Sequence, residues 1–446
     1  MKLIILTIIF LLSSSIFAND LVNVGVTTID ITPPIGTPLA GYGQPKRRMK
    51  GFLDWGRKYP YATFFAPSQG VLDPINVRTM VVEKNGKRVA FVSLDVVGIT
   101  SDFVKSLAKR LKKLNLGIDR KNLFVSGTHT HSGPGALTRR FSLAILAVDI
   151  FNKSIFNFVM DRVVQSIKDS ISNSEESYLY NLTFKTSNLQ NNRGAKPGFY
   201  DANARLLIAK NLKGDWLGGI VNYAIHGTAL SGKNMKLSAD MPGAIATKLE
   251  EALTSKNYLS NIKPTMVFIN GAEGDVSPRV GGEVGMKQIS ESFANQTLKA
   301  LSKAKLIIEP EINYKRKNVW VGFPSFNIKA CIENKKLRKF ISKYLAIPIT
   351  PLMPLVSSIS YVKIGNVMML SWPGEPTTQL GYDLRLIAKS FGNEHAWILG
   401  LTNDYLAYFV TKDEFKNGGY QACTSLYNYR GGRRILKGYK KLLGAQ

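Results

Sequence analysis

The order of apolar and polar residues predicts a chain built from short strands and a few helices. Residues 21–34, LVNVGVTTIDITPP, show the β-branched alternation of a strand, which the paired prolines should end. Residues 77–98 hold two β-rich runs around Asn85-Gly86, a dipeptide that favours a tight hairpin because both central residues need positive φ. Residues 101–115 place apolar side chains on one stripe opposite lysine and arginine. They predict an amphipathic helix with Ser101 or Asp102 as its cap.

Three apolar strands run directly into loops that are rich in glycine and in chemically active side chains. They are NLFVSGTHTHSGPG at 122–135, WLGGIVNYAIHGTAL at 216–230 and TMVFINGAEGDVSP at 265–278. Further strands are expected within 356–375 and 395–404. Active sites of α/β proteins commonly gather at strand ends, where the sheet holds the loops rigidly yet leaves them exposed. We therefore expect an α/β fold of mixed β-sheets flanked by helices, with the active site in loops at strand ends.

Two other apolar stretches admit two interpretations. FSLAILAVDIF at 141–151 and AIPITPLMPLV at 346–356 fit a hydrophobic core, which we favour, or a lipid-facing lip around the site. The proline spacing of the second stretch argues against a helix or a central strand there.

The first eighteen residues have the pattern of a secretory signal. Lys2 precedes an apolar run, and a serine-rich stretch ends at Ala18, where we expect cleavage. The apolar run is shorter than the roughly 20 residues that a membrane-spanning helix needs, so we prefer export, to the periplasm or the medium, over a retained anchor. Because no break in composition divides the remainder, residues 19–446 are expected to form a single catalytic domain.

The net charge bears on the partners of the protein, and the two cysteines bear on disulfides and metal ligands. A formal net charge of +28 favours anionic partners, among them an acidic membrane surface, although the basic residues could also be spread over solvated faces. No recognisable nucleic-acid motif accompanies the charge, so we expect no nucleic-acid partner. Cys331 and Cys423 either form one disulfide or remain free thiols, and they lack the close spacing of zinc-binding cysteines.

Histidine is scarce, yet three of the four histidines lie in the glycine-rich loops. His129 and His131 form an H-x-H pair that would turn both rings to one face on extended backbone, and His226 ends a separate strand. Neutral imidazole is a common nitrogen ligand of zinc. This placement favours a metal site, although each histidine taken alone is more often structural, as we expect for His395.

Two further loops carry oxygen ligands or donors. GAEGDVSP at 271–278 could present Ser277 and backbone N–H groups to a developing oxyanion, or it could be a plain aspartate turn. SWPGEPTT at 371–378 sets Glu375 after a strand, where the carboxylate could complete a metal site or simply be solvated.

Together these motifs resemble those of the neutral, non-lysosomal ceramidase family. GTHTHSGPG, NYAIHGT, GDVSP, PGE followed by two threonines, and GLTNDYLAYFVTKDEF stand in the family order along most of the mature chain, and NNRG at 191–194 is also similar. Arg279 and Pro376 depart from the family pattern, which bears on the substrate more than on the reaction. The resemblance implies the catalytic domain alone, with no C-terminal β-sandwich.

The resemblance also implies roles for individual residues. The ligands of a Zn²⁺ ion would be His129, His226, Glu375 and Tyr408. The reacting centre would be lined by the catalytic candidates Ser277, His131, Arg193 and Tyr420. His131 would deliver a proton to the leaving amine. Whether Ser277 is a nucleophile or a positioning and oxyanion group stays open, and we favour the second.

The function so implied is that of an exported zinc-dependent amidohydrolase. It would cleave the N-acyl amide bond of ceramide or a related N-acyl lipid with a zinc-activated water. One alternative is a zinc hydrolase of the same fold that acts on a different amide or ester. Another is a non-catalytic basic protein that binds lipid or polyanion.

Overall fold

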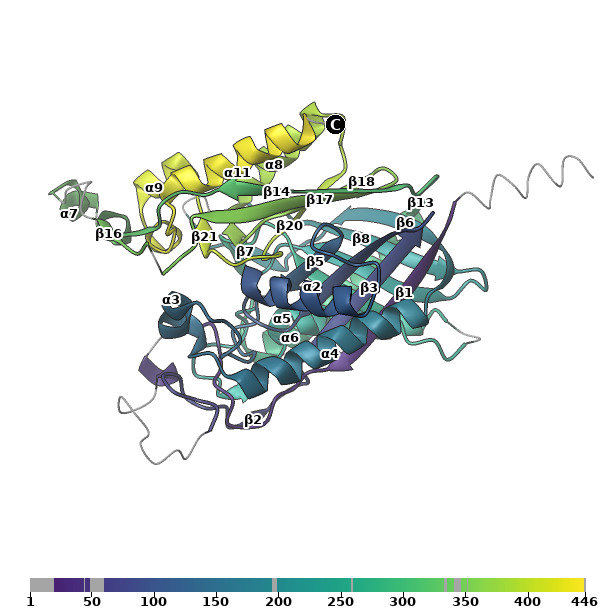
Figure 1. Ribbon diagram of the computed structural model, residues 1–446, viewed down its shortest axis with the longest axis horizontal. Coiled ribbons are helices and arrows are strands. Elements are labelled where there is room, and N and C mark those ends of the chain that lie inside the picture. The colour runs from purple at the N-terminus through teal and green to yellow at the C-terminus, as the bar shows by residue number, and fades with distance from the viewer. Residues whose placement is uncertain are drawn as a thin grey trace, which may run out of the picture.

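The computed structural model describes residues 20–43, 45–48, 60–194, 199–257, 260–332, 335–340, 346–350 and 352–444. The signal predicted for residues 1–18 lies outside the described residues. Within them, two β-sheets are stacked on each other and helices cover both outer faces (Figure 1). The expected α/β fold of mixed sheets flanked by helices is confirmed.

The larger sheet has nine strands and mixed pairing. Its order is β11-β9-β8-β6-β1-β3-β4-β5, with β13 also on β6. The pairs β9–β11 and β4–β5 are parallel and the others are antiparallel. The strand bounds are β1 (Leu21–Asp30), β3 (Asn76–Lys84), β4 (Lys87–Leu94), β5 (Leu123–Gly127), β6 (Glu175–Lys185), β8 (Asn203–Asn211), β9 (Trp216–Tyr223), β11 (Thr265–Asn270) and β13 (Lys305–Leu306).

The smaller sheet has four strands in the order β14-β17-β18-β20, and its last pair is parallel. One buried cluster, which includes Phe91, Phe124, Met369 and Trp397, fills the space between the two sheets. The strand bounds are β14 (Ile312–Trp320), β17 (Val356–Ile364), β18 (Val367–Ser371) and β20 (Ala396–Leu399).

Six long helices form the outer layers. Apolar faces of α2, α4, α5 and α6 pack on the free face of the larger sheet, whereas α8 and α11 pack on the free face of the smaller one. Their bounds are α2 (Ser101–Lys113), α4 (Lys153–Ser172), α5 (Asp240–Thr254), α6 (Gly282–Ala300), α8 (Thr378–Ser390) and α11 (Asn428–Leu443).

Most locally encoded elements were predicted correctly, and two details were wrong. The hairpin turns at Asn85 (φ 51°) and Gly86 (φ 72°), as expected. Helix α2 begins one residue after Thr100, whose side chain makes no capping bond, so neither Ser101 nor Asp102 is the cap. The core interpretation of 141–151 fails in part, because Phe141, Ile145 and Leu146 are exposed while their neighbours are buried.

No single helix among the described residues is both long and apolar enough to cross a bilayer. Two neighbouring helices, Phe141–Val148 and Lys153–Ser172, are together long and apolar enough by length and composition, but the chain bends by 89° between them.

Helix α5 begins at a buried aspartate that holds the loop after β9. Asp240 has a φ of 54°, and its carboxylate accepts hydrogen bonds from the backbone N–H groups of Ala229 (2.9 Å) and Leu230 (3.1 Å). Burial raises the pKa of Asp240 to about 6, although these hydrogen bonds oppose the shift.

The raised pKa of Asp240 predicts a pH-dependent stability. Between its ordinary pKa of about 3.9 in the unfolded chain and about 6 in the fold, the folded protein binds more protons at this group, so its contribution to the free energy of unfolding falls as pH rises. The difference in free energy of unfolding between wild type and Asp240→Asn should therefore change by up to about 3 kcal/mol between pH 4 and pH 6.5. Urea denaturation with EDTA present measures this. The variant of the exposed Asp413, Asp413→Asn, should show the same dependence of unfolding free energy on pH as wild type. The same dependence in Asp240→Asn would refute the raised pKa of Asp240.

Candidate metal centre

The ends of four strands deliver the predicted metal ligands to one place. Strands β5 and β9 of the larger sheet lead into His129 and His226, and β18 and β20 of the smaller sheet lead toward Glu375 and Tyr408. Short pairings lock these loops together. His131 N donates to Gly227 O at 2.9 Å, and β19 (Glu375–Pro376) pairs in parallel with β21 (Tyr408–Phe409), which sets Glu375 opposite Tyr408.

The donor atoms of these side chains are spaced as ligands of one small cation. His129 Nε2 and His226 Nε2 each lie 3.2 Å from Glu375 Oε2, and Tyr408 OH lies 3.0 Å from His226 Nε2. A tetrahedral ion with ligands at 2.0–2.1 Å has donor atoms about 3.3 Å apart. These separations therefore fit ligands of one zinc-sized ion, and such an ion can expand to five ligands to accept a water.

Backbone carbonyls set the tautomer of both imidazoles. His129 Nδ1 lies 2.7 Å from Val97 O, and His226 Nδ1 lies 2.8 Å from Glu273 O. A carbonyl can only accept, so each Nδ1 carries the ring proton and each Nε2 presents a lone pair to the centre. This explains why Glu375 Oε2 is buried without a hydrogen-bond donor among the described residues, although two ring nitrogens lie near it. A cation between this oxygen and the two lone pairs would relieve their repulsion.

The protonation states also suit a cation. Burial, and after it the charge of Arg193, lower the pKa of His226 to about 3, so the imidazole is neutral. Burial alone would raise the pKa of Glu375, and His129 and His226 hold it well below its usual range only where their Nε2 atoms carry protons. With both rings neutral, a bound cation would keep the carboxylate ionised. Burial, with Glu375 next, raises the pKa of Tyr408 well above that of an ordinary phenol.

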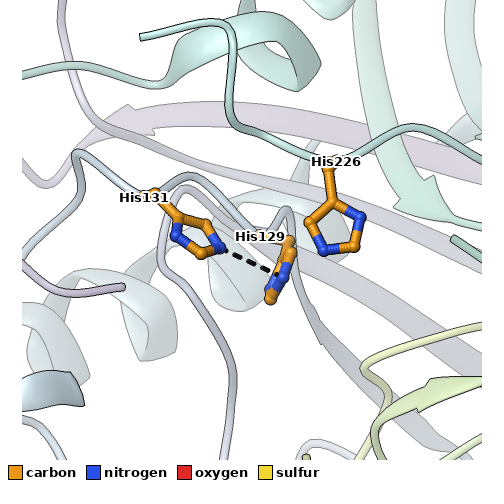
Figure 2. Close-up of side chains that lie close together, drawn as sticks. All are labelled: His129, His131 and His226. Carbon is orange, nitrogen blue, oxygen red and sulfur yellow. Dashed lines mark hydrogen bonds between the residues drawn. The ribbon is translucent and has the colours of Figure 1, made fainter. Parts of the chain in front are cut away.

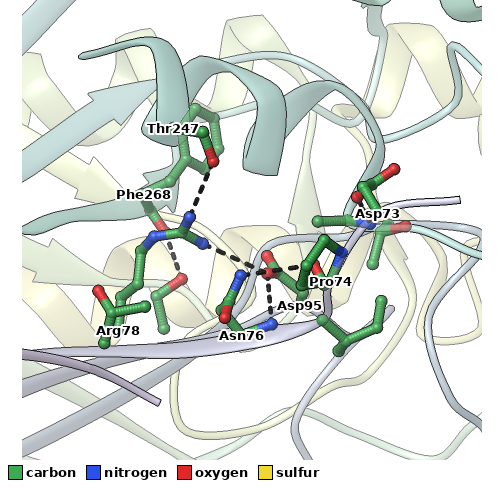
Figure 3. Close-up of polar contacts among 12 residues, drawn as sticks. Asp73, Pro74, Asn76, Arg78, Asp95, Thr247 and Phe268 are labelled. Carbon is green, nitrogen blue, oxygen red and sulfur yellow. Dashed lines mark hydrogen bonds and ion pairs between the residues drawn. The ribbon is translucent and has the colours of Figure 1, made fainter. Parts of the chain in front are cut away.

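A buried ion-pair cluster supports the strand end behind His129 (Figure 3). Arg78 of β3 lies 3.4 Å from Asp95 and 2.8 Å from Glu250 of α5, and Asn76 N donates to Asp95 at 2.9 Å. Burial raises the pKa of Asp95 to about 6 although Arg78 opposes the shift. The next residues after Asp95 supply the carbonyls that bind His129, so this cluster fixes the position of that ligand.

The conformation of His129 differs from the sequence expectation. Its φ is 71°, a left-handed value that is uncommon outside glycine and that clusters at functional sites, so the H-x-H pair is not plain extended backbone. Both rings nevertheless reach the same centre (Figure 2). His131 Nε2 lies 3.2 Å from His129 Nε2, and the ligand atoms of His129, His131 and His226 lie within 4.8 Å of one another, so the three histidines could also hold a metal ion.

The side of the centre nearest the cavity is formed by Arg193, His131 and Tyr420. Arg193 Nη2 donates to His226 Nε2 at 2.5 Å and to Tyr408 OH at 2.9 Å. The Tyr420 ring lies 5.5 Å from that of Tyr408. Because a guanidinium and a metal cation repel each other at this range, a bound ion requires Arg193 to draw back toward the cavity.

A cavity of about 710 Å³ opens over the centre. Its lining combines the polar side chains His131, Arg193, Glu375, Tyr408 and Tyr420 with apolar residues, among them Leu143, Leu146, Phe326 and Leu426. Glycine is required at position 41 in its wall, because φ is 102° and an added Cβ would lie 2.6 Å from the His131 ring.

Of the four catalytic candidates, Ser277 is the one that the structure does not place in this cavity. It is half-buried on β12 (Val276–Pro278), opposite Asn191 of β7 (Gln190–Asn192), and does not line the cavity. Its neighbour Val276 accepts a hydrogen bond from His226 N at 3.2 Å. His395, expected to be structural, is exposed after α8.

Two residues at the centre were missed in the sequence. Tyr405, the first tyrosine of YLAY, donates to Glu375 Oε1 at 2.7 Å. Glu273 is fully buried, and both of its carboxylate oxygens lack a partner among the described residues. Burial and then Glu375 raise the pKa of Glu273 well above its usual value, so its carboxyl is neutral. The only signal in the sequence was their position inside the GAEGDVSP and NDYLAY motifs.

The two cysteines form a disulfide, which confirms one of the two alternatives left open by the sequence. It joins η4 (Ile328–Cys331) to α10 (Tyr420–Cys423), the short helix that begins with Tyr420. The backbone adds one bond, from Gly419 N to Ala330 O at 3.1 Å. The disulfide therefore anchors the segment that brings Tyr420 to the cavity.

Loss of this disulfide should cost both stability and activity. The bond closes a loop of 92 residues, and disulfides stabilise by about 2–4 kcal/mol by restricting the unfolded chain. We expect Cys331→Ser/Cys423→Ser to lower the free energy of unfolding by that amount, as measured by urea denaturation. Turnover under folding conditions should also fall, because α10 loses its covalent anchor. Wild-type turnover in a stably folded double variant would show that Tyr420 is held without the disulfide.

Comparisons with known proteins show which sequences this chain is similar to. Residues 22–307 match the family model described as neutral/alkaline non-lysosomal ceramidase, N-terminal. The chain is 21% identical over 435 residues to the neutral ceramidase of Pseudomonas aeruginosa, covering 78% of this chain and 63% of that protein. It is 20% identical over 460 residues to neutral ceramidase B of Dictyostelium discoideum, covering 78% and 64%. The chain thus spans less than two thirds of these relatives.

The fold agrees as well. A crystal structure of neutral ceramidase from Pseudomonas aeruginosa superposes with a TM-score of 0.79 at 17% sequence identity, covering 95% of this chain and 74% of that one. A structure described as ceramidase complexed with C2 gives the same score and identity.

Proposed function

Because the chain belongs to the neutral/alkaline non-lysosomal ceramidase family, we propose that it is a zinc-dependent amidohydrolase that cleaves the N-acyl amide bond of ceramide or a related N-acyl lipid. The observation that carries the proposal is the convergence of two Nε2 lone pairs, one ionised carboxylate and one phenol from four strand ends. His129, His226, Glu375 and Tyr408 would hold the ion. When bound, zinc would polarise the amide carbonyl and lower the pKa of a water molecule.

The surrounding side chains supply the remaining tasks. Arg193 lies beside Tyr408 at the cavity edge, where its N–H groups can orient the amide oxygen and stabilise the negative charge that develops on it. His131 lines the cavity with a buried Nδ1 that has no partner in the described part of the chain, so it can carry a proton to the departing amine. Tyr420 also lines the cavity. Ser277, outside the cavity lining, is assigned a positioning role through its strand.

The lining of the cavity supports an N-acyl lipid as the substrate class. Leu143, Leu146, Phe326 and Leu426 give it an apolar wall next to the polar centre. An amide attached to hydrocarbon would place the reacting group at the ligands and the chain along this wall. Export, proposed from the amino-terminal pattern, would bring the protein to such lipids outside the cytoplasm.

Hydrolysis of labelled ceramide by the purified chain tests the proposal. Wild type should release fatty acid, and His226→Ala should lose both turnover and bound metal because a ligand is removed. His395→Ala is the matched control, because His395 is exposed and lies outside the cavity lining. Turnover of other amides or esters but not ceramide would favour the alternative substrate class. Unchanged turnover in His226→Ala would remove the metal role.

A further inference from the structure

The mouth of the cavity is rimmed by exposed apolar side chains from two separate parts of the chain. One side is α3 (Phe141–Leu143) and the π-helical turn η2 (Ala144–Val148), where Phe141 and Leu146 are each 53% exposed. The other is the two-stranded sheet of β15 (Ser325–Asn327) and β16 (Ala346–Pro348), where Ile347 is 52% exposed. Burying such side chains in water-free surroundings is favourable, so a cluster of them marks an interaction surface.

We call the exposed apolar side chains of these two segments and of the adjoining Leu352 the mouth face. Its members are Phe141, Ile145, Leu146, Phe326, Ile347 and Leu352. Leu146 and Phe326 both line the cavity. Phe326 pairs with Ile347 across β15 and β16, and Ser142 Oγ donates to Leu352 O at 2.8 Å, which ties the α3 side to the other. Figure 1 shows α3 and β16 toward the same end of the molecule.

Basic side chains stand in the segments that carry the mouth face. They are Arg139, Lys329, Lys336 and Arg338, whereas Arg140 is paired with the buried Asp404. Arg48 adds a guanidinium that donates to Ile145 O at 2.6 Å and to Leu146 O at 3.3 Å. These two bonds satisfy carbonyls of the η2 turn.

We propose that the mouth face docks on an anionic phospholipid surface and seats the cavity directly on the bilayer. Interfacial binding of this kind combines buried apolar area with attraction between Lys or Arg and anionic headgroups, and both are present around one opening. A soluble polyanion would use the basic residues and leave the apolar ones in water. The inference rests on the proposed function, because an opening against a bilayer serves a protein whose substrate resides there.

Vesicle binding by the purified full chain tests the docking without requiring hydrolysis. Vesicles of phosphatidylcholine with and without phosphatidylglycerol, free of any amide substrate and in EDTA, are sedimented with the protein. Wild type should bind the anionic vesicles more tightly. Phe141→Ser/Ile347→Ser should lower the partition coefficient about tenfold or more, because each side chain loses its apolar burial. Ile308→Ser removes an apolar side chain that is 71% exposed on another part of the molecule, and this variant should bind as wild type does.

The outcomes separate docking from catalysis. Equal vesicle binding by wild type and the serine pair, or binding abolished by salt and insensitive to the pair, would overturn the mouth face and assign the attraction to charge alone. With detergent-dispersed substrate, the pair should keep wild-type turnover because neither residue lines the cavity. Serine-sensitive vesicle binding together with no amidase activity in any variant would support the docking and refute the proposed function.

Discussion

Glu375→Gln should abolish stoichiometric metal binding and lower amidase turnover by at least about a hundredfold. Its Oε2 lies 3.2 Å from Nε2 of His129 and from Nε2 of His226, and its carboxylate is the one ionised group of the proposed ligand set. Altering a group that merely orients a ligand commonly costs 10–100-fold in affinity or activity, so removing a charged ligand should cost more. Elemental analysis of protein purified without an affinity metal measures the ion, and fatty-acid release from labelled ceramide measures turnover.

Glu273→Gln is the matched control for this experiment. Glu273 is buried in the same cluster, but its carboxyl is neutral, and the only part of it that contacts a ligand is its backbone carbonyl, which accepts from His226. The substitution keeps size and removes no charge, so metal content and turnover should remain near wild type. Equal losses in both variants would mean that any polar change in the cluster disrupts it. Retained metal in Glu375→Gln would show that another set of ligands binds the ion.

Elements encoded by neighbouring residues were predicted from the sequence because their causes are local. The Asn85-Gly86 turn needs only two residues with positive φ, and α2 needs only one apolar stripe. The predicted cap of α2 was wrong because Ser101 and Asp102 have side chains suited to capping and were therefore expected to form the capping hydrogen bond. In the fold, Asp404 accepts from Ser101 N at 3.0 Å, from more than three hundred residues away. Such a competing partner is not visible in a local pattern.

The candidate site was predicted as a set of segments, and its geometry came from the sheets. Family motifs named His129, His226, Glu375 and Tyr408, and the strand ends bring their donor atoms together. The bond from Tyr405 to Glu375 joins loops after β18 and β20, whose parallel pairing is a tertiary feature. The exposure of the apolar residues at 141–146 also depends on what packs against them, so composition alone could not decide between core and lip.

His131→Ala should retain the metal and lower kcat by about 10²–10⁴-fold, the range typical of a lost general acid or base. Both His129 and His226 donate from Nδ1 to a backbone carbonyl and turn Nε2 to the centre, as metal ligands do. Nδ1 of His131 is buried and, among the residues that the structure describes, has no partner. With Glu375 and Tyr408 the first two already complete a four-donor set, which leaves His131 on the cavity wall for proton transfer. The three histidines are nevertheless close enough to share an ion. If His131→Ala loses metal as fully as Glu375→Gln does, His131 is a ligand and the proton must come from another group.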